Sequence, residues 1–356
     1  MGTAFKIMLE KYGERVNNAL NGLIKKEADI AEKLTPIHGE YYKDIGEYLG
    51  RGGKRLRPAA FIAGYEGVGA KERGNIDLAS LSIELLHNAT LLHDDLIDHD
   101  ETRRGGPTFH AKYRERYRKK VDRAEDFGMA AAILGGNSTY NLGLEILLRS
   151  GFKPDLTIQA ISFYQRAFRE VIEGVLFESF LALKGESNEA EYLDVIRLKT
   201  SALFEKGLLI GATLGGGASS QKKAISKYAI LTGQAFQIQD DILGTFGTEK
   251  VTGKPADSDV KEGKQTILII KAFEFASESD KEKIRKTLGN QNASQNEISI
   301  VRKIIEKVGA LDYAKKLSIG LAEDGQKSLD FAEPQLTQEA NTFLKQLSDF
   351  VVKRSY

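Results

Sequence analysis

Residues 86–109 read LHNATLLHDDLIDHDETRRGGPTF, a stretch in which Asp94, Asp95 and Asp98 precede an arginine pair. Residues four apart lie on one face of a helix, so Asp94 and Asp98 would present their carboxylates together, with Asp95 beside them. Apolar residues before them recur at helical spacing, as in a core-facing helix: Leu78, Leu81, Leu85, Leu86 and Ala89. We therefore expect an apolar helix that ends in three clustered carboxylates.

Clustered carboxylates repel one another, and burying them unpaired is costly. A divalent cation would resolve this conflict, and oxygen ligands suit Mg²⁺, which often shares its coordination shell with substrate phosphates. Arg103 and Arg104, just downstream, are suited to bidentate phosphate capture. A solvated acidic helix end is the alternative, and for this motif alone it is the better explanation.

A second acidic pair in the chain favours the metal site over a solvated helix end. Residues 234–244 read QAFQIQDDILG and place Asp240 and Asp241 after another largely apolar helical stretch. Two acid-bearing helices facing one cavity would hold a metal cluster against a diphosphate. A third feature is the sequence RGGKRLRP at 51–58, in which glycines would allow close backbone approach and cations converge. A basic surface turn is the alternative for this segment.

Together these motifs resemble the trans-polyprenyl diphosphate synthases, the family of geranylgeranyl, farnesyl and longer-chain diphosphate synthases. The resemblance covers about residues 50 to 270. The matching pieces occur in the family's order: GGKRLRP at 52–58, HNATLLHDDLIDHDETRRG at 87–105, KT at 199–200, FQIQDD at 236–241, and GKPADSD with its trailing Lys264.

The resemblance implies a reaction that joins isopentenyl diphosphate to an allylic diphosphate and yields a linear polyprenyl diphosphate. It implies Mg²⁺, three ions per site with diphosphate bound. The implied metal ligands are Asp94, Asp95, Asp98, Asp240 and Asp241. The implied contacts to the allylic diphosphate are Arg103, Lys199, Lys254 and Lys264, and those to isopentenyl diphosphate are Lys54, Arg57, His87 and Arg104. Thr200 and Gln237 would stabilise the allylic cation, and Asp257 and Asp259 would lie in the outer metal shell.

Product length would depend on the floor of an apolar tunnel, one turn or so before the first aspartates. Ala89 and Thr90 occupy that level, and shorter-chain members of the family often carry an aromatic residue there. Small residues predict a product of twenty carbons or longer, although Tyr140 or Phe177 on a neighbouring helix would close the tunnel if either pointed into it.

Some positions depart from the family pattern. Asn137 stands where an aspartate is common, Val175 replaces a substrate-contacting glutamine, and Gly244 stands at the place of a third acid. These departures leave two alternatives. A class I terpene cyclase would lack the second acid pair and the GGKRLRP site, and a non-catalytic subunit of a heteromeric synthase would have lost one acid cluster.

The chain of 356 residues is 41% hydrophobic and carries 51 basic against 50 acidic residues, so its net charge gives no argument for nucleic acid as a partner. It has no cysteine, which excludes disulfides and thiolate metal sites. No stretch approaches the roughly 18–20 apolar residues of a membrane span, and the N-terminal residues do not resemble a secretory signal. We expect a cytoplasmic protein and, from the resemblance, a homodimer.

Helical spacing predicts an all-α fold. The resemblance implies a large single-domain bundle (residues 1–356) of the isoprenoid synthase type, with about 10 to 14 helices around a deep central cavity. A densely charged insertion at 111–127 is expected to be a solvated helix, with a lid or partner surface as the alternative. No strand is expected. The expected helices are 4–34, 40–49, 58–70, 75–100, 128–148, 155–183, 189–214 and 222–244, followed by a loop over 245–264 and helices to the C-terminus with breaks near 289–294 and at Pro334.

Overall fold

A computed structural model describes residues 3–70, 74–247 and 258–353, and these residues are almost entirely helical. The predicted all-α class is confirmed. The described residues form sixteen α-helices, more than the predicted range, because short helices such as α12 (Ser258–Glu262) lie where a loop was expected. No helix in these residues is both long enough and apolar enough to cross a bilayer.

The chain divides into two compact units, and each is described by itself. The first contains Met1–Gln165, Lys206–Ala218 and Thr337–Ala340, and the second contains the remainder. The division describes local packing, so the single domain stays a prediction.

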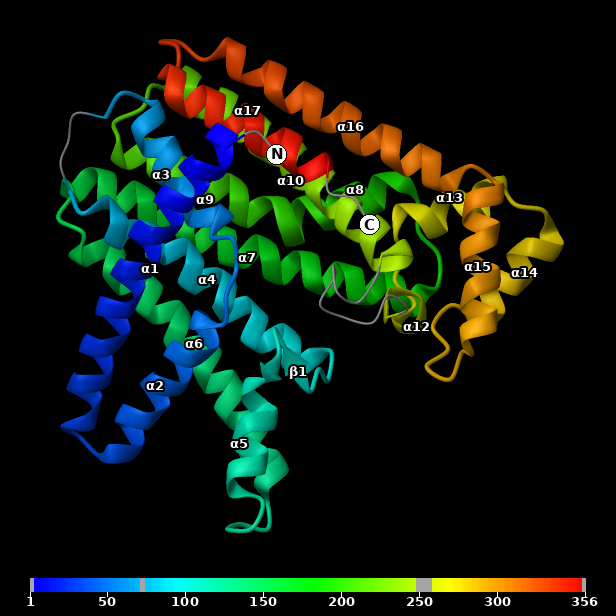
Figure 1. Ribbon diagram of the computed structural model, residues 1–356, viewed down its shortest axis with the longest axis horizontal. Coiled ribbons are helices and arrows are strands. Elements are labelled where there is room, and N and C mark those ends of the chain that lie inside the picture. Colours follow the sequence, from blue (N-terminus) through cyan, green and yellow to red (C-terminus); the bar gives the residue numbers. More distant parts are fainter. Residues whose placement is uncertain (1–2, 71–73, 248–257, 354–356) are drawn as a thin grey trace. The chain divides into compact units, whose positions relative to one another are not determined.

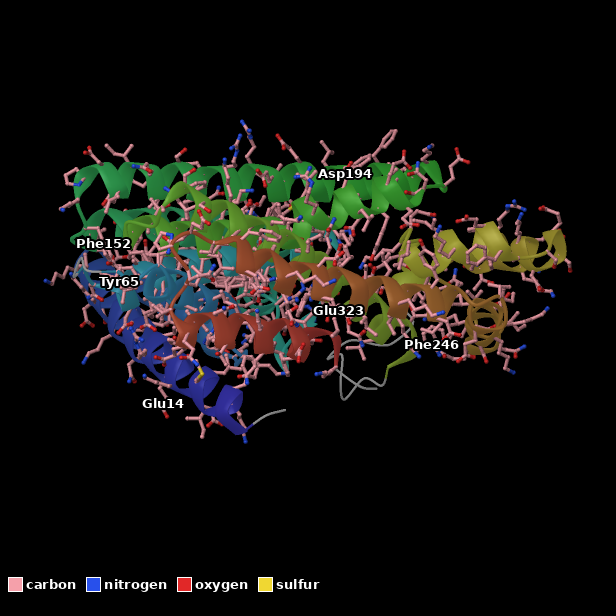
Figure 2. The ribbon with its side chains drawn as sticks, turned by 90° about the horizontal axis from the view of Figure 1, so that it is seen from above. Glu14, Tyr65, Phe152, Asp194, Phe246 and Glu323 are labelled. Carbon is pink, nitrogen blue, oxygen red and sulfur yellow. The ribbon has the colours of Figure 1, made fainter. Side chains whose placement is uncertain are left out.

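The first unit is built on α4, which runs beside α6 (Figure 1). Of the apolar residues that predicted a core-facing helix, four are at 0% exposure and Leu78 is only partly buried; the four are Leu81, Leu85, Leu86 and Ala89. Figure 2 shows Tyr65 and Phe152 together at one end of this unit, where their rings meet edge to face at 5.8 Å. Its elements are α1 (Thr3–Glu32), α2 (Pro36–Gly50), α3 (Leu56–Gly67), α4 (Ile76–Ile97), β1 (Thr102–Arg103), β2 (Gly106–Pro107), α5 (Phe109–Tyr117), α6 (Ala124–Arg149), and parts of α7 (Pro154–Lys184) and α9 (Ala202–Leu214).

The second unit is built on α10, which runs beside α16 (Figure 1). Its core contains a cluster of isoleucines and leucines from α10 and α13. Its elements are the rest of α7 and α9, α8 (Glu189–Ile196), a π-helical turn (Arg197–Ser201), α10 (Ser219–Phe246), α12, α13 (Ile267–Phe275), α14 (Glu278–Thr287), α15 (Gln295–Lys307), α16 (Ala310–Ser328), a 3₁₀ turn (Leu329–Phe331) and most of α17 (Gln338–Val352).

Several predicted boundaries were wrong. The third helix begins at Leu56 rather than at Pro58, because proline fits the first turn of a helix, where its missing N–H costs nothing. The residues after α4 form a two-stranded antiparallel hairpin, β1 with β2, where no strand was expected. Two residues per strand are too few for any alternating pattern to show in the sequence.

The charged segment at 111–127 is only partly solvated. Its first half forms most of α5, in which Tyr113 is buried and stacks on Phe109. Lys112 and Arg116 pair with Asp44 of α2, at 2.6 Å each, and Asp44 is only 7% exposed. Residues 118–123 are mostly exposed, as expected. The segment is therefore anchored to α2 rather than projecting freely.

Candidate active site

The first aspartate set lies where α4 ends. The backbone N–H of Asp98 donates to the Asp94 carbonyl at 2.8 Å, and Asp98 is the C-cap, so α4 is three residues shorter than expected. His99 then takes a left-handed conformation with φ of 55°. The Asp94 side chain is 24% exposed and Asp98 is exposed, so two carboxylates one turn apart can be reached by a ligand.

Asp95 is different, because it is 1% exposed and already holds two donors. The Tyr48 hydroxyl donates to its Oδ2 at 2.7 Å, and Arg103 Nε donates to its Oδ1. Burial raises the pKa of the Asp95 carboxyl, and Arg103 and Tyr48 oppose that shift. Asp95 therefore fixes Arg103 beside Asp94 and Asp100, whose carboxylates lie 4.0 and 3.3 Å from Arg103 Nη2.

Two cation-bearing loops meet in the first unit. Arg104 Nη1 donates to the Gly52 carbonyl at 3.1 Å, and Arg51 Nη1 donates to the Pro107 carbonyl at 2.6 Å. The hairpin after α4 is therefore joined to the glycine-rich loop before α3. Arg104 has a φ of 50°, an uncommon conformation for a residue other than glycine. Lys54 and Arg104 therefore lie on neighbouring loops, and their shared contact to isopentenyl diphosphate stays a prediction.

Arg55 anchors the glycine-rich loop before α3, a role that the sequence did not indicate. Its guanidinium donates to Glu84 Oε1 at 2.5 Å, to Asn17 Oδ1 at 3.0 Å and to the Leu49 carbonyl at 2.9 Å. The side chains of Arg55 and Glu84 are 4% and 6% exposed, so this is a buried ion pair. No spacing rule could have found it, because its partners lie on α1, α2 and α4.

Arg57 and His87 meet as the resemblance implied, with Nη1 of Arg57 3.2 Å from Nε2 of His87. Because the guanidinium is only a donor, Nε2 must be the accepting nitrogen of a neutral imidazole. Burial lowers the pKa of His87 well below its usual value, and the positive charges of Arg57 and Arg104 lower it further. His87 is thus neutral and ready to donate from its other nitrogen.

Lys199 and Thr200 lie in the π-helical turn of the second unit. Such turns are rare and occur often at functional sites. Lys199 Nζ pairs with Glu178 Oε2 at 2.6 Å, so the structure contains the ion pair that was the alternative to a phosphate partner. Gly174 of α7 allows this approach, because a Cβ there would lie 2.6 Å from the backbone nitrogen of Lys199.

Thr200 and the second aspartate pair form a chain of hydrogen bonds. Thr200 Oγ1 donates to Gln237 Oε1 at 2.6 Å, and Gln237 Nε2 donates to Asp241 Oδ1 at 2.8 Å. The Tyr192 hydroxyl donates to Asp241 Oδ2 at 2.7 Å. Burial raises the pKa of Asp241 to about 7, with the charge of Asp259 adding to the shift and the two donors opposing it. Asp240 is partly exposed, whereas Asp241 is buried.

Asp259 of α12 fills the place beside Gly244. A Cβ on Gly244 would lie 2.5 Å from Asp259 Oδ2, so a larger residue there would displace this carboxylate. Lys264 pairs with Asp259 at 3.1 Å and with Glu262 at 2.7 Å. Burial opposes the charge of Lys264, yet the two carboxylates raise its pKa well above the usual value. Lys254 and Asp257 lie outside the described residues.

Ala89, at the expected level of the tunnel floor, is fully buried in the first unit. Thr90 is partly buried, and its hydroxyl donates to the His87 carbonyl at 2.7 Å. Tyr140 stacks near Tyr164 and donates to Gln165 Oε1 at 2.5 Å, so its hydroxyl is held at the surface of that unit.

The donor set fits Mg²⁺. Asp94, Asp98 and Asp240 offer hard carboxylate oxygens that solvent reaches. In the part of the chain that the structure describes, no three His, Asp or Glu side chains already converge on one point. A bound ion would therefore need waters or phosphate oxygens as further ligands, which is usual for Mg²⁺. Direct metal binding by Asp95 and Asp241 stays a prediction.

Comparisons with known proteins agree with this chemistry. The family model described as polyprenyl synthetase matches residues 39–307. The chain is 34% identical to a geranylgeranyl diphosphate synthase of Methanosarcina mazei, over 91% of this chain and 94% of that protein. It is 33% identical to a geranylfarnesyl diphosphate synthase of Aeropyrum pernix, over 85% of this chain and 91% of that protein.

A solved structure gives the same result for the fold. The geranylgeranyl pyrophosphate synthase of Corynebacterium glutamicum, complexed with isoprenyl diphosphate and magnesium, matches 98% of this chain and 99% of its own, with a TM-score of 0.91 and 27% identity. The family model covers well over half of the chain, and the motifs that it matches are those described above. The chain therefore belongs to the polyprenyl synthetase family of isoprenoid synthases.

Proposed function

We propose that this protein is a trans-prenyltransferase that condenses isopentenyl diphosphate with an allylic diphosphate to give a linear polyprenyl diphosphate. The main support is the arrangement at the end of α4, where the solvent-accessible carboxylates of Asp94 and Asp98 lie one turn apart and that of Asp94 lies 4.0 Å from Arg103. Such a group of acids and a cation suits a diphosphate that arrives with metal ions. The relatives named geranylgeranyl and geranylfarnesyl diphosphate synthase support the same function.

The reaction breaks the carbon–oxygen bond of the allylic substrate, forms a carbon–carbon bond to isopentenyl diphosphate and releases a proton. When bound, Mg²⁺ neutralises the departing diphosphate, and we propose three ions held by Asp94, Asp98 and Asp240. Arg103, Lys199, Lys254 and Lys264 would add positive charge to the same diphosphate. For Lys199 this requires that the phosphate compete with Glu178, 2.6 Å away.

Isopentenyl diphosphate would bind at the two joined loops of the first unit. Lys54, Arg57 and Arg104 supply the positive charge, and neutral His87 supplies a donor without adding repulsion. Thr200 and Gln237 would stabilise the allylic cation through their oxygens. The chain carries no dedicated base in this proposal, and the released diphosphate takes the proton.

We propose a product of twenty carbons or longer. The support from this chain is that a small, fully buried residue, Ala89, stands at the level where shorter-chain members of the family often carry an aromatic side chain. The Methanosarcina and Aeropyrum relatives are named for geranylgeranyl and geranylfarnesyl products, which supports this length range.

We also propose that the protein is a homodimer. In the second unit, α7 exposes an apolar stripe at helical spacing: Ile172, Leu176, Phe180 and Leu183, the last 89% exposed. In the first unit, α6 exposes Ile133 and Leu134. Exposed apolar surface of this extent is typical of an association site. Light scattering with L176E/F180E would test the proposal, since the variant should be monomeric.

A cytoplasmic location remains the prediction made from the sequence.

The reaction is tested by incubating the protein with Mg²⁺, labelled isopentenyl diphosphate and, in turn, dimethylallyl, geranyl and farnesyl diphosphates. Chromatography of the products should give a series that ends in one dominant length. If folded protein elongates none of the primers, the proposed function is wrong, and a terpene cyclase or a non-catalytic subunit becomes the better explanation.

A further inference from the structure

The two residues of the second aspartate pair have unlike surroundings. Asp240 is partly exposed, whereas Asp241 is buried and uses both carboxylate oxygens. Its Oδ2 accepts from Tyr192 at 2.7 Å and its Oδ1 accepts from Gln237 at 2.8 Å. The first pair has the same construction, with Tyr48 and Arg103 as the donors to buried Asp95. A carboxylate with both oxygens engaged is suited to holding its donors in place.

Asp241 determines which way the Gln237 amide points. A carboxylate only accepts hydrogen bonds, so the NH₂ group of Gln237 must face Asp241 and its carbonyl must face Thr200. The spacing favours this contact, because the two residues are four apart on α10. With the amide reversed, Gln237 Oε1 and Asp241 Oδ1 would be two acceptors facing each other at hydrogen-bond distance, and the Nε2 hydrogens would face the Thr200 hydroxyl hydrogen unless that hydroxyl turned.

The orientation of the Gln237 amide also fixes the direction of the hydrogen bond from Thr200. Since the Gln237 carbonyl accepts at 2.6 Å, the Thr200 hydroxyl must use its only hydrogen in that bond. Both oxygen lone pairs of Thr200 then remain for another partner. The π-helical turn, in which Thr200 is 9% exposed, limits the freedom of this side chain.

We propose that Asp241 is a positioning residue, which orients the Gln237 amide and through it the Thr200 hydroxyl so that lone pairs rather than a proton are offered to the developing allylic cation. This inference rests on the proposed function. Chains of hydrogen bonds polarise one another, so the negative charge of Asp241 also increases the electron density on the Thr200 oxygen. A bare carboxylate next to the cation would form a covalent bond with it, whereas a hydroxyl oxygen reached through an amide stabilises the charge with less risk of capture.

Equilibrium binding of two analogues tests the proposal without turnover. One is an isoprenoid diphosphate with a tertiary ammonium nitrogen in place of the carbon that becomes cationic, and the other is its uncharged carbon isostere. Calorimetry with Mg²⁺ gives both dissociation constants for the wild type, Asp241→Leu and Asp241→Asn. Asp241→Leu should lower the preference for the cationic analogue about tenfold or more and change binding of the neutral one less than twofold.

The variants separate the possible roles. Asp240→Asn is the matched control and should weaken binding of both analogues to the same extent. If Asp241 were a metal ligand, Asp241→Leu would also weaken binding of both analogues equally, and that result would overturn the proposal. An unchanged preference in Asp241→Leu would also overturn it. If Asp241→Leu does not fold, Asp241→Asn keeps the shape and should lose part of the preference. If the wild type binds neither analogue, the proposed function fails rather than the role of Asp241.

Discussion

Replacing Arg55 by methionine should strongly destabilise the protein, because it breaks a buried ion pair from one side. The change removes the donors to Glu84, Asn17 and the Leu49 carbonyl. Glu84, whose side chain is 6% exposed, then keeps the Asn88 amide, at 3.2 Å, as its side-chain donor among the described residues. Losing one partner of such a pair typically costs about 3–5 kcal/mol. A protein is stable by only about 5–15 kcal/mol.

Urea unfolding followed by circular dichroism at 222 nm measures this cost. Lys43→Met is the matched control, because Lys43 pairs with Glu32 at a similar distance, 2.9 Å, with both side chains largely exposed. That substitution should leave the unfolding midpoint unchanged, since solvent screens the exposed pair. The double variant R55M/E84L removes both charges and should recover most of the lost stability, as apolar replacements of buried pairs often do.

The functional effect should follow the stability effect. In any R55M protein that folds, the loop that carries Lys54 and leads into Arg57 at the start of α3 loses its anchor, so the KM for isopentenyl diphosphate should rise more than the KM for the allylic substrate. An R55M midpoint equal to that of Lys43→Met would refute the assignment of a buried pair, and equal changes in both KM values would refute the anchoring role.

Further predictions concern the helix that carries the first aspartates. A Cβ at Gly136 would lie 2.1 Å from His93 Nε2, so Gly136→Ala should lower the melting temperature unless the imidazole swings out, and His93→Ala should suppress the effect of Gly136→Ala. His87 should stay neutral in NMR titration through the range near pH 6.5 where an ordinary histidine titrates, because burial and Arg57 lower its pKa. The unfolded state takes up that proton and the folded state does not, so stability should fall as the pH drops below about 6.5, and His87→Gln should reduce this slope. Ala89→Phe should shorten the product seen by chromatography; an unchanged length would place the tunnel floor elsewhere.

Periodicity predicted the core face of α4 because burial repeats with the helical turn, whereas for α7 and α10 it predicted only that a helix is present. The end of α4 was less predictable. The charged run DHDET continues after Ile97 with no proline or glycine, yet His99 takes a left-handed conformation with φ of 55°. The motifs therefore indicated the helix but not the residue at which it ends.

The sequence predicted the residues that would contact ligands directly, but not the buried residues that hold them in place. Asp94 and Asp240 carry their chemistry in their side chains, so the motifs pointed to them directly. Tyr48 lies 47 residues before its partner Asp95, and Tyr192 lies 49 before Asp241. No short-range rule relates residues so far apart, so the buried role of the second aspartate in each pair appears only in the fold. The π-helical turn at Lys199 likewise has no sequence signal that we could identify.

Both aspartate sets should act together in one prenyl transfer. The most direct measurement of this compares Asp94→Asn, Asp240→Asn and the double variant in the labelled-product assay. Groups that act as a unit are strongly non-additive. Each single substitution should therefore lower kcat about as much as the double substitution does, while circular dichroism shows folded protein. Independent, multiplicative losses, or full activity in either single variant, would contradict the account.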